Sequence, residues 1–142
     1  MTFMTFTAHV HPVLVHFPIG LVLTAAIAEV IAIVTGRENW GVVAAANVRA
    51  GALVAAAAVV SGWFLAASTI VGGDSSLEWH RWIGTAAAIV TFVAALASGR
   101  ADRRSPAAVW IYRLALFGAA LFVAVTGHLG GLLVWGVDFL RP

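Results

Sequence analysis

The chain has 142 residues, of which 62% are hydrophobic and only 10% are charged, with a formal net charge of +2. A soluble domain has about 45–50% apolar and about 25% charged residues, so the composition excludes an ordinary soluble protein. Cysteine is absent, which excludes disulfides, thiolate metal sites and covalently attached c-type haem. The eight basic residues are all arginine, and in so apolar a chain they indicate membrane topology rather than nucleic-acid binding.

Four long apolar runs predict an all-α protein, a transmembrane four-helix up-down-up-down bundle that forms one domain over residues 1–142. A helix needs about 20 apolar residues to cross the hydrocarbon region, and short connections favour antiparallel neighbours. The predicted helices lie at about 12–35, 42–71, 80–98 and 106–135. The start, MTFMTFTAHV, has no basic region and no small-residue cleavage site, so the first run is expected to be a helix of the mature protein.

The distribution of arginines predicts the orientation of this bundle in the bacterial inner membrane. The first connection carries Arg37 and the third carries the arginines of residues 100–104, whereas the second is acidic through Asp74 and Glu78. By the positive-inside rule, the first and third connections face the cytoplasm. Both termini and the second connection are then expected on the extracytoplasmic side.

Histidines gather at the predicted outer ends of three helices. His9, His11 and His16 precede or open the first run, and His80 opens the third. His128 lies about 22 residues into the fourth run, which at 1.5 Å per residue is about 33 Å from its inner end. Neutral imidazole is the commonest metal ligand, and bundle cores hold metals and haem between facing helices. We therefore take all but His9, an expected solvated residue, as candidate axial ligands of haem iron.

Glycines lie about one helical turn from three of these candidate ligands, or directly beside them. A macrocycle packed against a helix needs such clearance, although small residues also serve close helix packing. Arg81 follows a candidate ligand and is suited to pair with a haem propionate near the outer surface. The residues assigned to cofactor binding in this way are Gly20, Gly84, Gly127, Gly131 and Arg81.

The spacing within the first run bears on the number of haems. His11 and His16 are five residues apart, so they point about 140° from each other on a regular helix and face different neighbours. One or two bis-histidine haems are compatible with that arrangement. Pro18 weakens the angle, because it removes a backbone hydrogen bond and clashes with the carbonyl of Leu14. Pro12 is expected in the first helical turn.

Three charged residues fall at a common predicted depth of about 10 Å from the inner end of the bundle. They are Glu29, Arg49 and Arg113. A charge within the membrane costs free energy and normally finds a partner inside the bundle. The sequence predicts a buried Glu29–Arg49 or Glu29–Arg113 pair, with Asn47 as a further partner. Our interpretation of this pair is a structural clasp whose arginines reach toward the cytoplasm.

Three stretches, HPVLVHFPIG, WHRWIG and GHLGGLLVWG, resemble the signature stretches of the bacterial "domain of unknown function 2231" family of predicted membrane proteins. The resemblance covers nearly the whole chain and implies a four-helix fold. Members of that family resemble small haem-bearing membrane cytochromes. The resemblance also implies which residues form the family's pattern, namely His11, His16, His80, His128, Gly20, Gly127, Gly130 and Gly131.

Three functions stay open on these observations. The first is a membrane b-type cytochrome with one or two haem b groups near the periplasmic face, which transfers single electrons with a quinol or a periplasmic electron carrier as partner. The second is a histidine-rich site for Cu, Zn or Fe, and the third is a structural or assembly subunit without cofactor. The sequence has no nucleophile–base pair, phosphate-binding loop or paired catalytic carboxylates, so electron transfer is favoured over catalysis. A homo-oligomer contact at the third helix also stays open.

Overall fold

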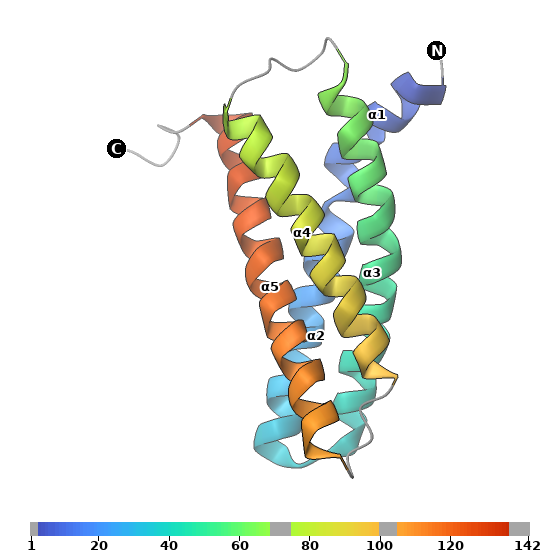
Figure 1. The fold of residues 1–142 in the computed structure, drawn as a ribbon, viewed down its shortest axis with the longest axis vertical. Coiled ribbons are helices and arrows are strands. Elements are labelled where there is room, and N and C mark those ends of the chain that lie inside the picture. The colour runs from blue at the N-terminus through green and yellow to red at the C-terminus, as the bar shows by residue number, and fades with distance from the viewer. Residues whose placement is uncertain (1–2, 69–74, 100–104, 137–142) are drawn as a thin grey trace.

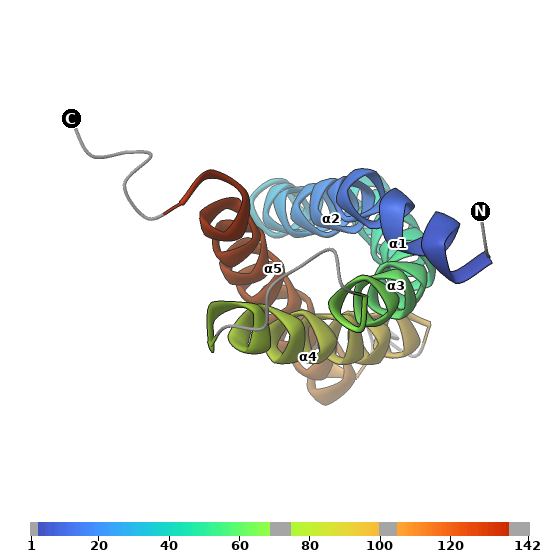
Figure 2. The ribbon, with the colours of Figure 1, turned by 90° about the horizontal axis from the view of Figure 1, so that it is seen from above.

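The computed structural model describes residues 3–68, 75–99 and 105–136, and these form five helices. The helices are α1 (Phe3–Leu14), α2 (His16–Thr35), α3 (Glu38–Ala66), α4 (Ser75–Ser98) and α5 (Pro106–Trp135). Helices α2 to α5 lie side by side along the long axis of the molecule (Figure 1), and seen from above they surround a common centre (Figure 2). Helix α1 packs mainly against α3 near one end of this bundle. The all-α prediction is confirmed for the described residues.

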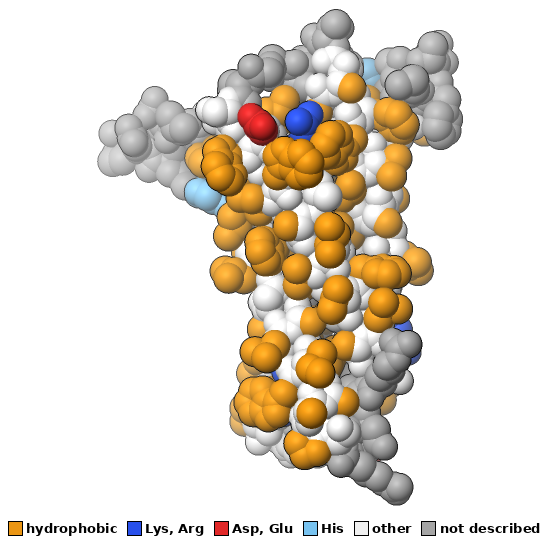
Figure 3. Space-filling view, viewed as in Figure 1, with side chains coloured by type: hydrophobic (Ala, Val, Ile, Leu, Met, Phe, Trp, Pro, Cys, Tyr) orange, Lys and Arg blue, Asp and Glu red, His pale blue; other side chains and the backbone are white. Residues whose placement is uncertain are grey.

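Four segments are long and apolar enough to cross a membrane, as the sequence predicts. Helices α1 and α2 together supply one segment, residues 6–35, and α3, α4 and α5 supply the others. No more than a third of the most apolar stretch of each segment is buried inside the chain. Large hydrophobic side chains instead cover the length of the visible face in Figure 3. Such a surface is suited to lipid, because hydrocarbon solvates it without loss of free energy.

The interior of the bundle consists mostly of small side chains. Ala25, Ala44, Ala94 and Ala119 are fully buried, and Leu116 is the largest side chain that is completely enclosed. In lipid no hydrophobic driving force holds helices together, so association depends on close van der Waals contact between small residues. The alanine-rich composition therefore gives closely packed helices rather than a core of large apolar groups.

The first transmembrane segment is broken, and it begins earlier than the predicted bound at residue 12. The chain is helical from Phe3, and a break at Val15 separates α1 from α2. Pro18 explains the break, because it has no N–H to donate to the carbonyl of Leu14. The prediction that Pro12 lies in the first helical turn is wrong, since this residue lies inside α1. Val15 itself keeps helical dihedral angles, φ −62° and ψ −24°, so the 140° angle between the two histidines of this segment stays a prediction.

Three further helix boundaries differ from the prediction. Helix α3 begins at Glu38 rather than at residue 42, where an acidic side chain in the first turn complements the helix dipole. It ends at Ala66, and the hydroxyl of Ser68 then bonds back to the carbonyl of Leu65 at 2.6 Å. Helix α4 begins at Ser75, five residues before the predicted start. Residues 69–71, predicted as helical, lie outside the described residues.

The first and last turns of the helices agree with their sequence signals. Gly36 ends α2 with a positive φ of 65°, and its N–H bonds to the carbonyl of Ala32 at 3.0 Å. Ser105 caps α5 and Pro106 begins it, which matches the predicted start of the fourth run. Asp74 and the arginines of residues 100–104, on which the predicted orientation depends, lie outside the described residues.

Candidate histidine site

His11 lies on α1 one turn before the break, and it is bonded to α3. Its Nδ1 is 3.0 Å from the carbonyl oxygen of Ala58 and 3.0 Å from the hydroxyl oxygen of Ser61. A carbonyl oxygen only accepts hydrogen bonds, so Nδ1 carries the proton and donates it. In the neutral imidazole Nε2 then keeps its lone pair, which is the state that binds a metal. Ser61 is 1% exposed and also donates to Ala58, so this contact is enclosed by protein.

A glycine of α3 makes room for the imidazole of His11. A Cβ atom built on Gly62 would lie 2.7 Å from Cε1 and 3.3 Å from Nε2 of that ring. Real Cβ atoms essentially never approach so closely, so the position requires glycine. Sequence analysis missed Gly62, because an isolated glycine in an alanine-rich helix does not show which side chain packs against it.

His80 on α4 repeats this arrangement against α5. Its Nδ1 is 3.1 Å from the carbonyl oxygen of Thr126, so Nδ1 again carries the proton and Nε2 the lone pair. A Cβ atom built on Gly130 would lie 3.1 Å from Cε1 of this ring. The two partly buried histidines thus come from two different helix pairs, α1 with α3 and α4 with α5. Helix α1 and the first turns of α4 lie at the same end of the bundle (Figure 1), so both histidines belong to that end.

Arg81, the residue after His80 on α4, has unused hydrogen-bonding capacity. The central carbon of its guanidinium group is 4.3 Å from the ring centroid of Trp63, a cation–π distance. Its Nε is buried and has no hydrogen-bond partner among the described residues. Trp63 is held in turn by a hydrogen bond to Thr85 and an edge-to-face contact with Trp82, with ring centroids 5.4 Å apart. This arrangement places a positively charged donor near His80.

The other two candidate ligands lie on the outer surface of the chain. His16, the first residue of α2, and His128 on α5 are both exposed. Neither is hydrogen-bonded or ion-paired within the part of the chain that the structure describes. His9, which is expected to be solvated, is also exposed. Of the four candidate ligands, two are therefore partly buried and hydrogen-bonded to a neighbouring helix, one on α1 and one on α4.

The glycines that were predicted to make room for a haem ring do not lie against the candidate ligands. A Cβ atom on Gly84 would contact Thr126 at 3.2 Å, and one on Gly127 would contact Ile19 at 3.3 Å, so both lie where helices pack closely. A Cβ atom on Gly20 or Gly131 would meet nothing within 4 Å. None of these four glycines lies against a candidate ligand, whereas Gly130, which the family resemblance includes, lies against His80.

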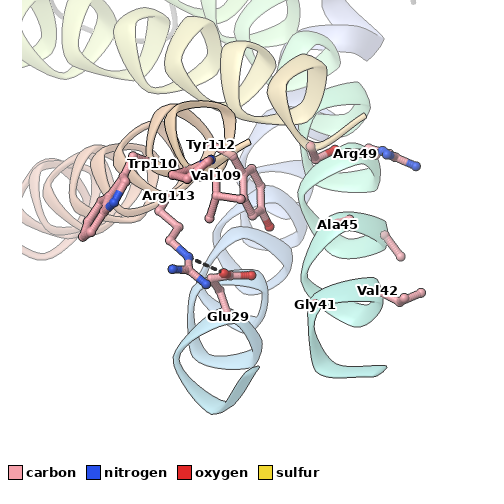
Figure 4. Close-up of a pocket in the computed structure, with 12 residues that line it drawn as sticks. Glu29, Gly41, Val42, Ala45, Arg49, Val109, Trp110, Tyr112 and Arg113 are labelled. Carbon is pink, nitrogen blue, oxygen red and sulfur yellow. Dashed lines mark hydrogen bonds and ion pairs between the residues drawn. The ribbon is translucent and has the colours of Figure 1, made fainter. Parts of the chain in front are cut away.

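A second polar cluster lies toward the opposite end of the bundle, and it confirms one of the two predicted ion pairs. Nε of Arg113 donates to Oε1 of Glu29 at 2.8 Å, and Glu29 is only 5% exposed. Arg49 instead donates to the hydroxyl of Ser98 at 2.9 Å. The prediction that Asn47 supports the pair is wrong, because its amide donates to the carbonyl of Val43 in its own helix. Figure 4 shows the ion pair and the cavity beside it.

The fold defines an all-helical membrane protein with four segments long and apolar enough to cross a membrane. Two partly buried histidines are hydrogen-bonded to backbone carbonyls at one end of its bundle. Residues 7–139 match the family of predicted membrane proteins called DUF2231, and the chain belongs to this family. The resemblance noted in the sequence is thereby confirmed. Comparisons with curated proteins and with solved structures gave no significant match.

Proposed function

We propose that this protein is a membrane b-type cytochrome that holds haem b between His11 and His80 and transfers single electrons. When bound, the haem supplies a one-electron iron couple, whose potential depends on the two axial ligands and on their burial. In this proposal the bundle runs up-down-up-down in the bacterial inner membrane, with both termini and the haem near the extracytoplasmic face. A quinol or a periplasmic carrier is the proposed electron donor or acceptor.

The observation that carries this proposal is the hydrogen bonding of the two imidazoles. Each donates Nδ1–H to a backbone carbonyl, of Ala58 in one case and Thr126 in the other. A carbonyl partner at Nδ1 fixes the tautomer and orients the ring, and it raises the basicity of the ligating nitrogen. An axial haem ligand needs a neutral imidazole with its proton on Nδ1 and a free lone pair on Nε2. A histidine whose side chain only reaches toward the membrane surface does not need this arrangement. Gly62 and Gly130 leave room for the two rings, since an added Cβ atom would lie 2.7 Å from Cε1 of His11 and 3.1 Å from Cε1 of His80.

Arg81 supports the same proposal through its unpartnered donor. A haem propionate carries negative charge, and a guanidinium group binds a carboxylate through charge-assisted hydrogen bonds. The buried Nε of Arg81 offers such a bond beside His80. Its stacking on Trp63 limits the conformations of the side chain, so little entropy is lost on binding.

A structural role is the second candidate, and one observation favours it. The same hydrogen bonds join α1 to α3 and α4 to α5, so the histidines also hold helices together. A bare-metal site has less support, because the described residues contain no group of three or more His, Asp or Glu side chains that could hold a metal ion.

The visible spectrum of the purified protein, produced with an adequate haem supply, tests the proposal. We expect a Soret band and, after dithionite, a sharp α band of six-coordinate haem b. His11→Ala and His80→Ala should each abolish this spectrum, whereas His9→Ala serves as the matched histidine control and should keep it. A colourless protein that takes up no added haem would refute the cytochrome and leave the structural role. Loss of part of the haem in His16→Ala or His128→Ala would assign a second haem to the exposed histidines.

A further inference from the structure

The cavity beside the Glu29–Arg113 pair is not used by the proposed cytochrome function. Its volume is about 670 Å³, and residues of α2, α3, α4 and α5 line it. This volume lies within the range of small-molecule sites, about 300–1,000 Å³. Val42, Val109 and Trp110 give it apolar walls, and three charged side chains give it a polar side.

The charges that line this cavity do not balance. Glu29 and Arg113 neutralise each other at 2.8 Å. Arg49 has the hydroxyl of Ser98 as a partner but no carboxylate within the described part of the chain. Among the described residues that line the cavity, the side chains therefore carry one more positive than negative charge. A charge of this kind in a membrane-embedded site attracts an anion, because surroundings of low dielectric constant screen it poorly.

Tyr112 provides a second, independent observation. Its side chain is 95% buried, being 5% exposed, and its hydroxyl has no hydrogen-bond partner in the described part of the chain. Figure 4 shows this hydroxyl pointing from α5 toward the Glu29 carboxylate at the cavity. An unsatisfied buried hydroxyl is costly in free energy, and an acceptor oxygen that enters the cavity would satisfy it.

We propose that this cavity binds the phosphate group of an anionic phospholipid from the adjacent leaflet. A phosphodiester carries one negative charge, which balances the excess positive charge of Arg49. Guanidinium groups bind phosphate oxygens through directed, charge-assisted hydrogen bonds, and the Tyr112 hydroxyl is a further donor. The apolar walls receive the start of the acyl chains. Free phosphate offers the same oxygens but gains nothing from these walls, so the lipid is the favoured source. The proposal does not depend on haem.

Native mass spectrometry of the delipidated full-length protein tests this site. The probes are phosphatidylglycerol, zwitterionic phosphatidylcholine with the same acyl chains, and inorganic phosphate. We expect one phosphatidylglycerol to bind about tenfold more tightly than phosphatidylcholine, which corresponds to one charge-assisted contact. Inorganic phosphate at millimolar concentration should neither bind nor displace the lipid.

Three variants distinguish lipid binding in this cavity from nonspecific attraction between surface arginines and anionic lipid. Arg49→Gln should abolish the preference for phosphatidylglycerol. Arg37→Gln, which removes an exposed arginine outside the cavity, should keep it. Tyr112→Phe retains the packed ring and should weaken binding severalfold, so it tests the site even if Arg49→Gln does not fold. Equal losses in the two arginine variants, unchanged binding in Tyr112→Phe, or displacement by inorganic phosphate would each overturn the proposal.

Discussion

Arg113 on α5 donates from Nε to Oε1 of Glu29 on α2 at 2.8 Å, and it thereby joins residues 84 positions apart in the chain. The carboxylate is almost completely buried, whereas the guanidinium side chain is 28% exposed. The acid therefore depends on this partner more than the base does, because arginine can reach water along its long side chain.

Glu29→Gln should lower the stability of the protein by about 2 kcal/mol. The loss of one partner of a buried ion pair leaves the other charge without compensation, and the partial exposure of Arg113 reduces the usual penalty. Thermal unfolding in detergent measures the effect, with Glu78→Gln on the surface of α4 as control. In a double-mutant cycle, Glu29→Gln and Arg113→Gln together should cost less than the sum of the single losses. Additive losses would show that the pair contributes no coupling.

Gly62→Ala should destabilise the protein by about 1–3 kcal/mol, because the added methyl group overlaps the ring of His11 at 2.7 Å. The matched control is Gly131→Ala, where a Cβ meets nothing within 4 Å. That substitution should be neutral or stabilising by up to about 1 kcal/mol, since alanine favours helix over glycine. Thermal unfolding of the haem-free protein compares the two, and equal effects would contradict the packing of His11 against Gly62.

Arg81→Gln should weaken haem binding about tenfold while leaving the positions of the absorption bands unchanged. The substitution removes a charge-assisted bond to a propionate but leaves both proposed axial ligands in place. Titration of the haem-free protein with haem measures the affinity. Arg37→Gln, at the other end of the bundle, is the control for a general change in net charge. A shift of the bands would instead place Arg81 in contact with a ligand.

The proposed orientation can be tested by labelling, because the chain has no cysteine of its own. A cysteine at Ser75, the first residue of α4, should react with a membrane-impermeant maleimide added to intact spheroplasts. A cysteine at Arg37, between α2 and α3, should react only after the membrane is permeabilised. The opposite pattern would invert the bundle and place the histidine site at the cytoplasmic face.

Several features of the molecule follow from local sequence alone. Apolar runs of sufficient length require transmembrane helices, and Ser105 followed by Pro106 locates the start of α5. Pro18 marks the weak point of the first segment, where the structure has its break. A partner for Glu29 was also predictable, because a charge at that depth needs one. Which arginine provides it depends on helix rotation, and only the structure shows that it is Arg113.

The tertiary structure decides which histidines are inside. In a soluble helix the apolar face points to the core, but a helix in lipid is apolar on both faces, so its hydrophobic pattern does not reveal its rotation. For this reason His11, His16, His80 and His128 were all predicted as ligands, although only the first and third of them are partly buried in the structure. The contact between His11 and Gly62 arises where α1 crosses α3, and helix crossings are set by packing between segments distant in the chain.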